Sequence, residues 1–114
     1  MLMLIYKVFL EPEWAELEQN GETAGAPIDL VDGYIHFSTA EQLRETVTKH
    51  FANKPNLILA TVETDGIADE IKWEVSRGGA KFPHLYRKLK RSEVIAYTSV
   101  PRGEHGHILP KEIP

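Results

Sequence analysis

Three polar side chains that can do chemistry alternate along one short stretch of the chain, at Tyr34, His36 and Ser38. In a β-strand alternate side chains point to the same face, so these three would share a face while the two apolar residues between them enter the core. A phenol, an imidazole and a hydroxyl then lie within about 7 Å of chain. We expect this row to hydrogen-bond a polar ligand, with His36 as a candidate catalytic residue that can exchange a proton near neutral pH.

A helix is predicted directly after this stretch, because Ser38 and Thr39 each begin a capping-box pattern that ends in Glu41 or Gln42. Free N–H groups and the positive end of the helix would face the same space as His36, which favours an anion. Ser38 and Thr39 are therefore candidate ligand contacts, as is Tyr34. The alternative is that Ser38 only caps the helix and that His36 is a half-buried structural histidine.

A second informative stretch runs from Lys81 to Tyr86. Pro83 fixes the backbone before His84, and apolar neighbours would anchor the stretch in the core. His84 and Tyr86 would then be presented by a rigid loop, which is how binding residues are often held. We treat His84 as a second candidate catalytic residue and Tyr86 as a candidate ligand contact. The alternative is an aromatic loop that packs beneath the sheet.

Charged residues around this stretch offer further contacts. Arg87 is a candidate anion contact, with a solvated surface as the alternative. Glu74 alternates with Trp73, which we expect in the core, so Glu74 is a candidate catalytic carboxylate. His105 and His107 have no third ligand nearby, and no metal site is predicted. The local basic run comprises Lys81, Arg87, Lys88, Lys90 and Arg91.

The elements that must position these residues follow from hydrophobic periodicity and helix signals. The order strand, helix, strand, helix and then several strands predicts an α+β domain with a curved, mixed or split sheet and two short helices. We expect one domain over residues 1–114, with an irregular tail from about 101 to 114. Strands are predicted over 1–10, 34–37, 57–63, 71–75 and 94–100, helices over 11–20 and 39–52, and a loop over 22–33.

Composition limits the possible functions. The 114 residues include no cysteine, which excludes disulfides and thiolate metal sites, and the formal net charge is −4. A mildly acidic domain lacks the field of a nucleic-acid binder, and the apolar start is too short for a signal segment or a membrane span. We therefore expect a cytoplasmic protein that binds neither nucleic acid nor membrane. The common nucleotide-binding, zinc-protease and α/β-hydrolase motifs are missing.

Two stretches together resemble a known family. Residues 32–39 read Asp-Gly-Tyr-Ile-His-Phe-Ser-Thr and are followed by Gln42, and residues 82–86 read Phe-Pro-His-Leu-Tyr. In this order and spacing they are similar to the domain-of-unknown-function 952 family of small bacterial proteins, and the resemblance covers most of the chain. The family usually continues the second stretch with Gly-Pro-Leu, whereas this chain has Arg87, Lys88 and Leu89.

The resemblance implies a fold similar to that of the ADP-ribosyltransferases, a split, curved sheet around a cleft for a nicotinamide dinucleotide. In that broader group a histidine on an early strand binds the ribose, which would match His36. An aromatic ring stacks on nicotinamide and a late carboxylate assists the transfer, which would match Tyr86 and Glu74 by residue type. NAD is accordingly a possible cofactor.

Three functions remain open from the sequence. The first is a small-ligand domain that binds a nucleotide or another anion in a His36/His84 cleft without turnover. The second is an NAD-dependent enzyme similar to ADP-ribosyltransferases. The third is a protein-interaction domain in which the histidines and aromatic residues are packing or interface groups. Whether the two histidines meet, and the oligomeric state, are not predicted.

Overall fold

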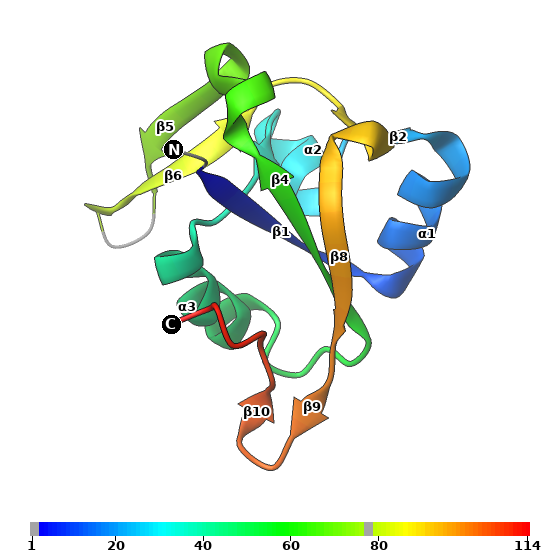
Figure 1. Cartoon of the computed structure of the whole chain (residues 1–114), viewed down its shortest axis with the longest axis vertical. Coiled ribbons are helices and arrows are strands. Elements are labelled where there is room, and N and C mark those ends of the chain that lie inside the picture. The colour runs from blue at the N-terminus through cyan, green and yellow to red at the C-terminus, as the bar shows by residue number, and fades with distance from the viewer. Residues whose placement is uncertain (1–2, 77–78) are drawn as a thin grey trace.

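In the computed structural model, which describes residues 3–76 and 79–114, a long antiparallel sheet forms the centre of the α+β fold (Figure 1). Its strands are β1 (Leu4–Leu10), β4 (Leu57–Glu63) and β8 (Val94–Val100), in the order β1-β4-β8. The strands predicted over 57–63 and 94–100 have these bounds. Of the strand predicted over 1–10, residues 1 and 2 lie outside the described residues.

The helix α1 (Glu11–Asn20) follows β1 without a loop. Glu13 accepts a hydrogen bond from the N–H of Leu10 at 2.9 Å, and proline occupies the first turn, where its missing N–H costs nothing. Gly21 ends the helix at φ +77°, a conformation that glycine adopts without steric cost. Trp14 and Leu17, three residues apart on one face of this helix, are buried against the central sheet.

The helix α3 (Ala40–His50) covers the other face of the central sheet. Thr39 is its N-cap and exchanges hydrogen bonds with Gln42, so the capping box begins at Thr39 and not at Ser38. Leu43 and Val47 pack against Tyr6 and other residues of the sheet. The predicted helix end near residue 52 lies two residues beyond the observed one.

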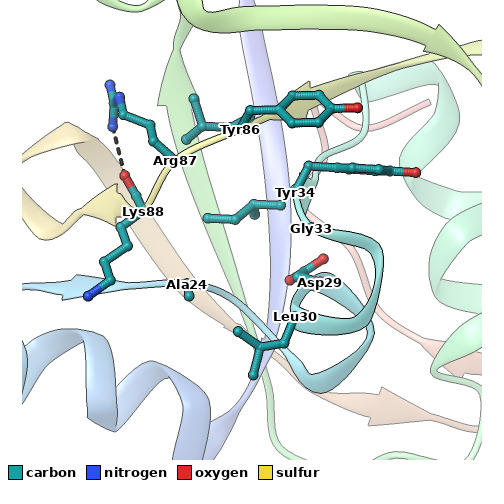
Figure 2. A pocket seen from close by; sticks show the side chains of 10 residues that line it. Ala24, Asp29, Leu30, Gly33, Tyr34, Tyr86, Arg87 and Lys88 are labelled. Atoms are coloured by element: carbon teal, nitrogen blue, oxygen red, sulfur yellow. Dashed lines mark hydrogen bonds between the residues drawn. The ribbon is translucent and has the colours of Figure 1, made fainter.

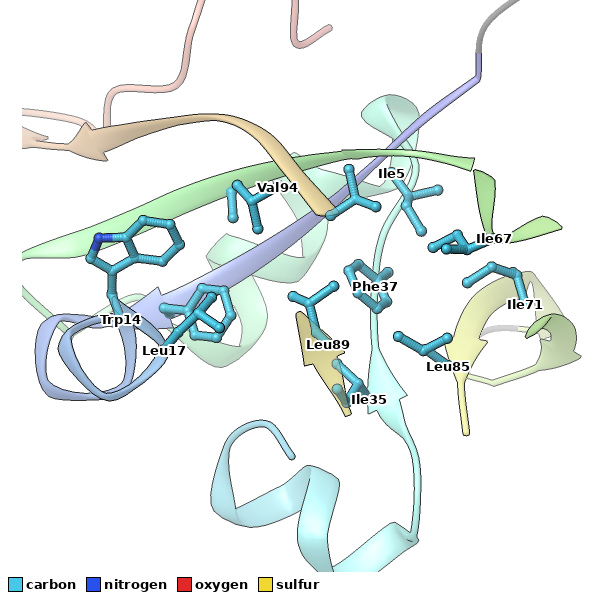
Figure 3. Packing of buried hydrophobic residues seen from close by; sticks show 13 residues of the cluster. Ile5, Trp14, Leu17, Ile35, Phe37, Ile67, Ile71, Leu85, Leu89 and Val94 are labelled. Atoms are coloured by element: carbon cyan, nitrogen blue, oxygen red, sulfur yellow. The ribbon is translucent and has the colours of Figure 1, made fainter. Parts of the chain in front are cut away.

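A second, smaller sheet lies on the α1 side of the central sheet. It consists of β3 (Ile35–His36), β6 (Lys81–Leu85) and β5 (Ile71–Val75), all antiparallel, with β6 in the middle. Its inner face packs into the core shown in Figure 3. Within the described residues that core comprises Ile5, Phe9, Trp14, Leu17, Ile35, Phe37, Ala60, Val62, Ile67, Ile71, Leu85, Leu89 and Val94.

The structure corrects several predictions. Residues 81–86 were expected to form a loop, but 81–85 are a central strand in which Pro83 lacks an N–H and its carbonyl accepts from the N–H of Phe37 at 3.0 Å. The loop expected over 22–33 contains a third helix, α2 (Pro27–Asp32), started by proline and ended by Gly33 at φ +85°. Every strand pair described is antiparallel, so the sheets are split but not mixed.

Two further predictions fail because they depend on tertiary contacts. Trp73 was expected in the core, yet it is 39% exposed, and Val75 is also exposed. The alternation of β5 is as predicted, but this end of the strand extends beyond the core. The tail is not wholly irregular either, because β9 (Arg102–Gly103) pairs with β10 (Gly106–His107) and Ile113 is buried beside α3.

The remaining elements are short. The strand β2 (Glu22–Thr23) pairs with β7 (Leu89–Lys90). Single 3-10 turns occupy Thr64–Gly66, Ala68–Glu70 and Arg91–Glu93. Within residues 3–76 and 79–114, none of the helices has the length and apolar character needed to cross a bilayer.

Candidate functional site

The outer face of the small sheet brings the two predicted histidines together. His36 of β3 lies directly opposite His84 of β6 in the strand register, and their ring centroids are 5.3 Å apart in an edge-to-face arrangement. Tyr34 and Tyr86 occupy the next positions on the same face, and Glu74 comes from β5. The alternation of the strands explains this grouping, because Ile35 lies between Tyr34 and His36, Leu85 lies between His84 and Tyr86, and both enter the core.

Glu74 forms a hydrogen bond with one ring nitrogen of His84. Its Oε1 lies 2.8 Å from Nδ1 of His84 and accepts a second hydrogen bond from the Tyr86 hydroxyl at 2.7 Å. The hydrogen bonds from His84 and Tyr86 lower the pKa of Glu74. The same hydrogen bond to Glu74 is the main reason that the pKa of Tyr86 rises to about 12. An ionised Glu74 therefore accepts from both groups at neutral pH.

His84 has a free acceptor as a consequence. Because Glu74 accepts from Nδ1, the neutral imidazole carries its proton on that nitrogen and presents a lone pair at Nε2. The His84 side chain is 2% exposed, and Nε2 has no hydrogen-bond partner within the described part of the chain. A buried polar atom without a partner is unusual in a folded protein and points to a missing partner.

His36 is placed differently, since carboxylates face both of its nitrogens. Nδ1 lies 2.5 Å from Oδ1 of Asp29, and Nε2 lies 3.0 Å from Oδ2 of Asp32. Both hydrogen bonds can form together only when the imidazole carries two protons. His36 thus joins the cluster with both nitrogens already occupied, whereas His84 keeps one free.

Asp29 and Asp32 are residues of the site that the sequence did not reveal, and Asp29 has the more extensive contacts. The carboxylate of Asp29 is 1% exposed and accepts from Nζ of Lys7 at 2.7 Å, from the N–H of Ala26 at 2.7 Å and from the N–H of His36 at 3.0 Å, besides the His36 ring. Burial raises its pKa, but the hydrogen bonds from His36 and Lys7 outweigh this, and the pKa is lowered. A signal was available: a lysine inside an apolar strand needs a buried partner.

Tyr34 and Tyr86 contact the histidine cluster and also line a cavity of about 250 Å³. The Tyr34 ring stacks on His84 with centroids 4.1 Å apart, and the Tyr86 ring lies 5.0 Å from Tyr34. In Figure 2 the two tyrosine side chains extend side by side and point away from Arg87 and Lys88. Neither imidazole lines the cavity. The lining residues are Ala24, Asp29, Leu30, Gly33, Tyr34, Ile35, Leu85, Tyr86, Arg87 and Lys88.

Three other predicted contacts have partners elsewhere. Ser38 pairs through its backbone with Tyr6 of β1, and its hydroxyl lies 3.0 Å from that of Thr46 in α3, because β3 ends before this position. Thr39 caps α3. Arg87 lines the cavity, but its guanidinium binds Glu70 and Glu93 at distances down to 2.5 and 2.6 Å.

Two further observations concern a positive charge beside the site and the absence of a metal-binding group among the described residues. Nζ of Lys72 lies 4.6 Å from the centre of the Tyr86 ring, which places a positive charge at the outer edge of the cluster. Among the residues that the structure describes, no group of three or more histidines and acids is arranged to hold a metal ion.

Comparison with known proteins gives close matches of unknown function. Residues 8–97 match the family model described as "Protein of unknown function (DUF952)". The crystal structure of protein CC0527 from Caulobacter crescentus has 43% sequence identity and a TM-score of 0.87, with 91% of each chain covered. The solution NMR structure of the same protein has 43% identity and a TM-score of 0.82, with 91% of this chain and 90% of that chain covered. No curated protein matches the chain.

Proposed function

Because this chain belongs to the DUF952 family of proteins of unknown function, we propose its function from the geometry of the site: it binds a small ligand that carries a planar ring and a hydrogen-bond donor. The ring packs against Tyr34 and Tyr86, and the donor reaches Nε2 of His84 after the Tyr34 ring, which stacks on His84, has moved aside. His84 is therefore the central ligand contact of the predicted set. His36 positions the surrounding groups through Asp29 and Asp32.

The observation that carries this proposal is the unpaired nitrogen of His84. A buried acceptor without a partner costs about 1–3 kcal/mol, and Nε2 of His84 lies in a side chain that is 2% exposed. A donor on the ligand removes that cost. Glu74 fixes the ring and its tautomer through Nδ1, so the acceptor is oriented before the ligand arrives.

The tyrosines and the cavity indicate the shape of the ligand. Tyr86 is 44% exposed and Tyr34 half-buried, which leaves aromatic surface for stacking. A cavity of about 250 Å³ is smaller than most sites for drug-sized ligands. A nucleobase or a nicotinamide ring is of the right size, and the rest of a nucleotide or dinucleotide such as NAD would lie outside the cavity.

The charges favour a neutral or cationic ring over a free anion. Three carboxylates, Asp29, Asp32 and Glu74, surround the histidines, and the lysines beside them are Lys7 and Lys72. The basic run predicted to hold an anion is largely paired with acids. Its ion pairs are Arg87 with Glu70 and Glu93, Lys88 with Glu22, and Arg91 with Glu18.

An NMR titration of amides and histidine rings tests the proposal, with nicotinamide, adenosine, ADP-ribose and NAD as probes. We expect saturable shifts at residues 34–36 and 81–86. His84→Phe keeps the ring volume and removes the acceptor, so it should weaken binding at least about tenfold while the protein remains folded. His105→Phe, in the exposed tail, is the matched control. Absence of shifts at millimolar concentrations of all four probes would contradict the proposal.

A second candidate is an NAD-dependent enzyme similar to ADP-ribosyltransferases, and the position of Glu74 favours it. Its ionised carboxylate lies beside both tyrosines, where it could stabilise a cationic, oxocarbenium-like ribose after the bond to nicotinamide breaks. The bonding electrons leave with nicotinamide, and an acceptor hydroxyl or water attacks the ribose and loses its proton. Nicotinamide release from NAD that disappears in Glu74→Gln, with NAD binding retained, would support this candidate.

A further inference from the structure

The helix α2 has an inverted pattern of burial. Its one buried residue is the charged Asp29, which is 1% exposed, whereas Ile28, Leu30 and Val31 are 57%, 63% and 80% exposed. A surface helix normally turns its apolar side chains inward. Apolar burial therefore contributes little to holding α2 in place, and polar contacts must do so.

Those polar contacts converge on two carboxylates. Asp29 accepts hydrogen bonds from Lys7 in β1 and from the ring and N–H of His36 in β3, and Asp32 lies 3.0 Å from the other nitrogen of His36. Asp29 also accepts from the N–H of Ala26 at the start of the helix. Loss of the Asp29 carboxylate would leave α2 attached mainly by its two ends.

Both ends of α2 are glycines in the left-handed conformation, Gly25 at φ +100° and Gly33 at φ +85°. Glycine moves between left- and right-handed conformations without steric cost, which suits a hinge. Gly25 also lies close to the Asp29 carboxylate, because a Cβ at this position would lie 2.2 Å from Oδ2 of Asp29. The absence of a side chain at Gly25 is thus a condition for seating the carboxylate.

The same helix forms a wall of the cavity. Asp29, Leu30 and Gly33 line it from one side and Tyr86 from another, and Figure 2 shows α2 beneath the tyrosine pair. Leu30 and Tyr86 of the lining are exposed, so the cavity already opens to solvent, and outward motion of α2 would widen that opening.

We propose that α2 is a lid over the cavity, latched by the Asp29 carboxylate and hinged at Gly25 and Gly33. Opening breaks the hydrogen bonds of Asp29 and Asp32 and uncovers part of the cavity wall at Ile35 and Leu85, but it leaves the central sheet paired, so it costs less than global unfolding. The lid gates the ligand site proposed above, and in that respect it rests on the proposed function. Its opening and closing do not require a ligand.

Hydrogen exchange of the ligand-free protein tests the lid. We expect amides of residues 24–36 to exchange faster than those of β4 in the wild type, and Asp29→Asn to accelerate residues 24–36 by about tenfold or more. Gly25→Ala should do the same with every polar group retained. Gly21→Ala is the matched control, because it adds a Cβ at a similar φ of +77° with nothing within 4 Å.

Asp32→Asn provides a milder variant, because this carboxylate is 35% exposed and its replacement should not prevent folding. It should accelerate exchange of the same segment by a smaller factor. Exchange of residues 24–36 as slow as that of β4 in the wild type, or no acceleration of residues 24–36 in Gly25→Ala and Asp32→Asn, would overturn the lid. Slower exchange of residues 24–36 on adding NAD or nicotinamide would join the lid to the ligand site. If the variants accelerate exchange of residues 24–36 as expected but neither NAD nor nicotinamide slows it, the lid is supported and the proposed ligand is contradicted.

Discussion

Nζ of Lys7 lies 2.7 Å from Oδ2 of Asp29, and the two side chains are 7% and 0% exposed. Lys7 interrupts the face of β1 that otherwise presents Ile5 and Phe9 to the core. This ion pair connects the central sheet to α2, and through Asp29 to His36 and the outer face of the small sheet. This buried ion pair therefore links the candidate site to the central sheet.

We expect Lys7→Met to be strongly destabilising. The substitution leaves Asp29 buried with one partner fewer, and the loss of one member of a buried pair typically costs about 3–5 kcal/mol. Lys49→Met is the matched control, because Nζ of Lys49 also lies 2.7 Å from a carboxylate, Glu45, but both side chains are more than half exposed. Its cost should stay within about 0.5 kcal/mol. Urea unfolding measures both, and equal costs would show that the Lys7 pair does not hold the fold.

Acid should weaken the protein partly through Asp29. Its pKa is lower in the folded chain than its ordinary value of 3.8, because hydrogen bonds from His36 and Lys7 outweigh the effect of burial. The folded state then binds a proton less readily than the unfolded state. The stabilisation is fully present above pH 3.8 and is lost as the pH falls through the lower folded pKa.

The measurement is the free energy of unfolding between about pH 6 and pH 2, taken by urea titration of the wild type and Asp29→Asn. The difference between the two proteins should be constant above pH 3.8 and shrink below it. Asp69→Asn, an exposed carboxylate, serves as control and should follow the wild-type curve. A difference that stays constant down to pH 2 would contradict the role of Asp29.

Tyr86 should make the free energy of unfolding depend on pH in the alkaline range. Its hydrogen bond to Glu74 raises its pKa from 10.0 to about 12, so the stabilisation is complete below pH 10 and is lost as the pH rises toward 12. Tyr86→Phe removes the hydroxyl and keeps the ring. Its difference in unfolding free energy from the wild type should therefore shrink between pH 10 and 12. Ultraviolet titration of the phenols gives an independent readout, in which one late-titrating tyrosine should disappear in Tyr86→Phe.

Much of the fold was predictable because it depends on local sequence. The apolar runs of β4 and β8, the glycine that ends α1 and the Glu45–Lys49 pair on α3 all follow from period, capping and spacing. The strand β6 was not predictable in the same way, because its proline argues against a central strand. Tertiary pairing with β3 and β5 overrides that local preference.

The candidate site was likewise predictable only where it depends on local sequence. Strand alternation placed Tyr34 and His36 on one face from sequence alone, yet nothing local could show that His84 lies directly opposite His36. Asp29 and Asp32 were hidden in a segment that looked like a loop, because α2 has no apolar stripe facing inward. Arg87 looked like a free cation until the fold brought Glu70 and Glu93 to it.

The two tryptophans should differ sharply in their contribution to stability. Trp14 is 7% exposed and packs against Phe9 with ring centroids 5.7 Å apart, whereas Trp73 is 39% exposed at the end of β5. Trp14→Ala should cost about 3–5 kcal/mol through the cavity it leaves, and Trp73→Ala should cost less than about 1 kcal/mol. Fluorescence of the variants adds a check, since the protein that retains only Trp73 should be quenched readily by iodide. A large cost for Trp73→Ala together with protection from iodide would place this side chain in a buried contact that the described fold does not contain.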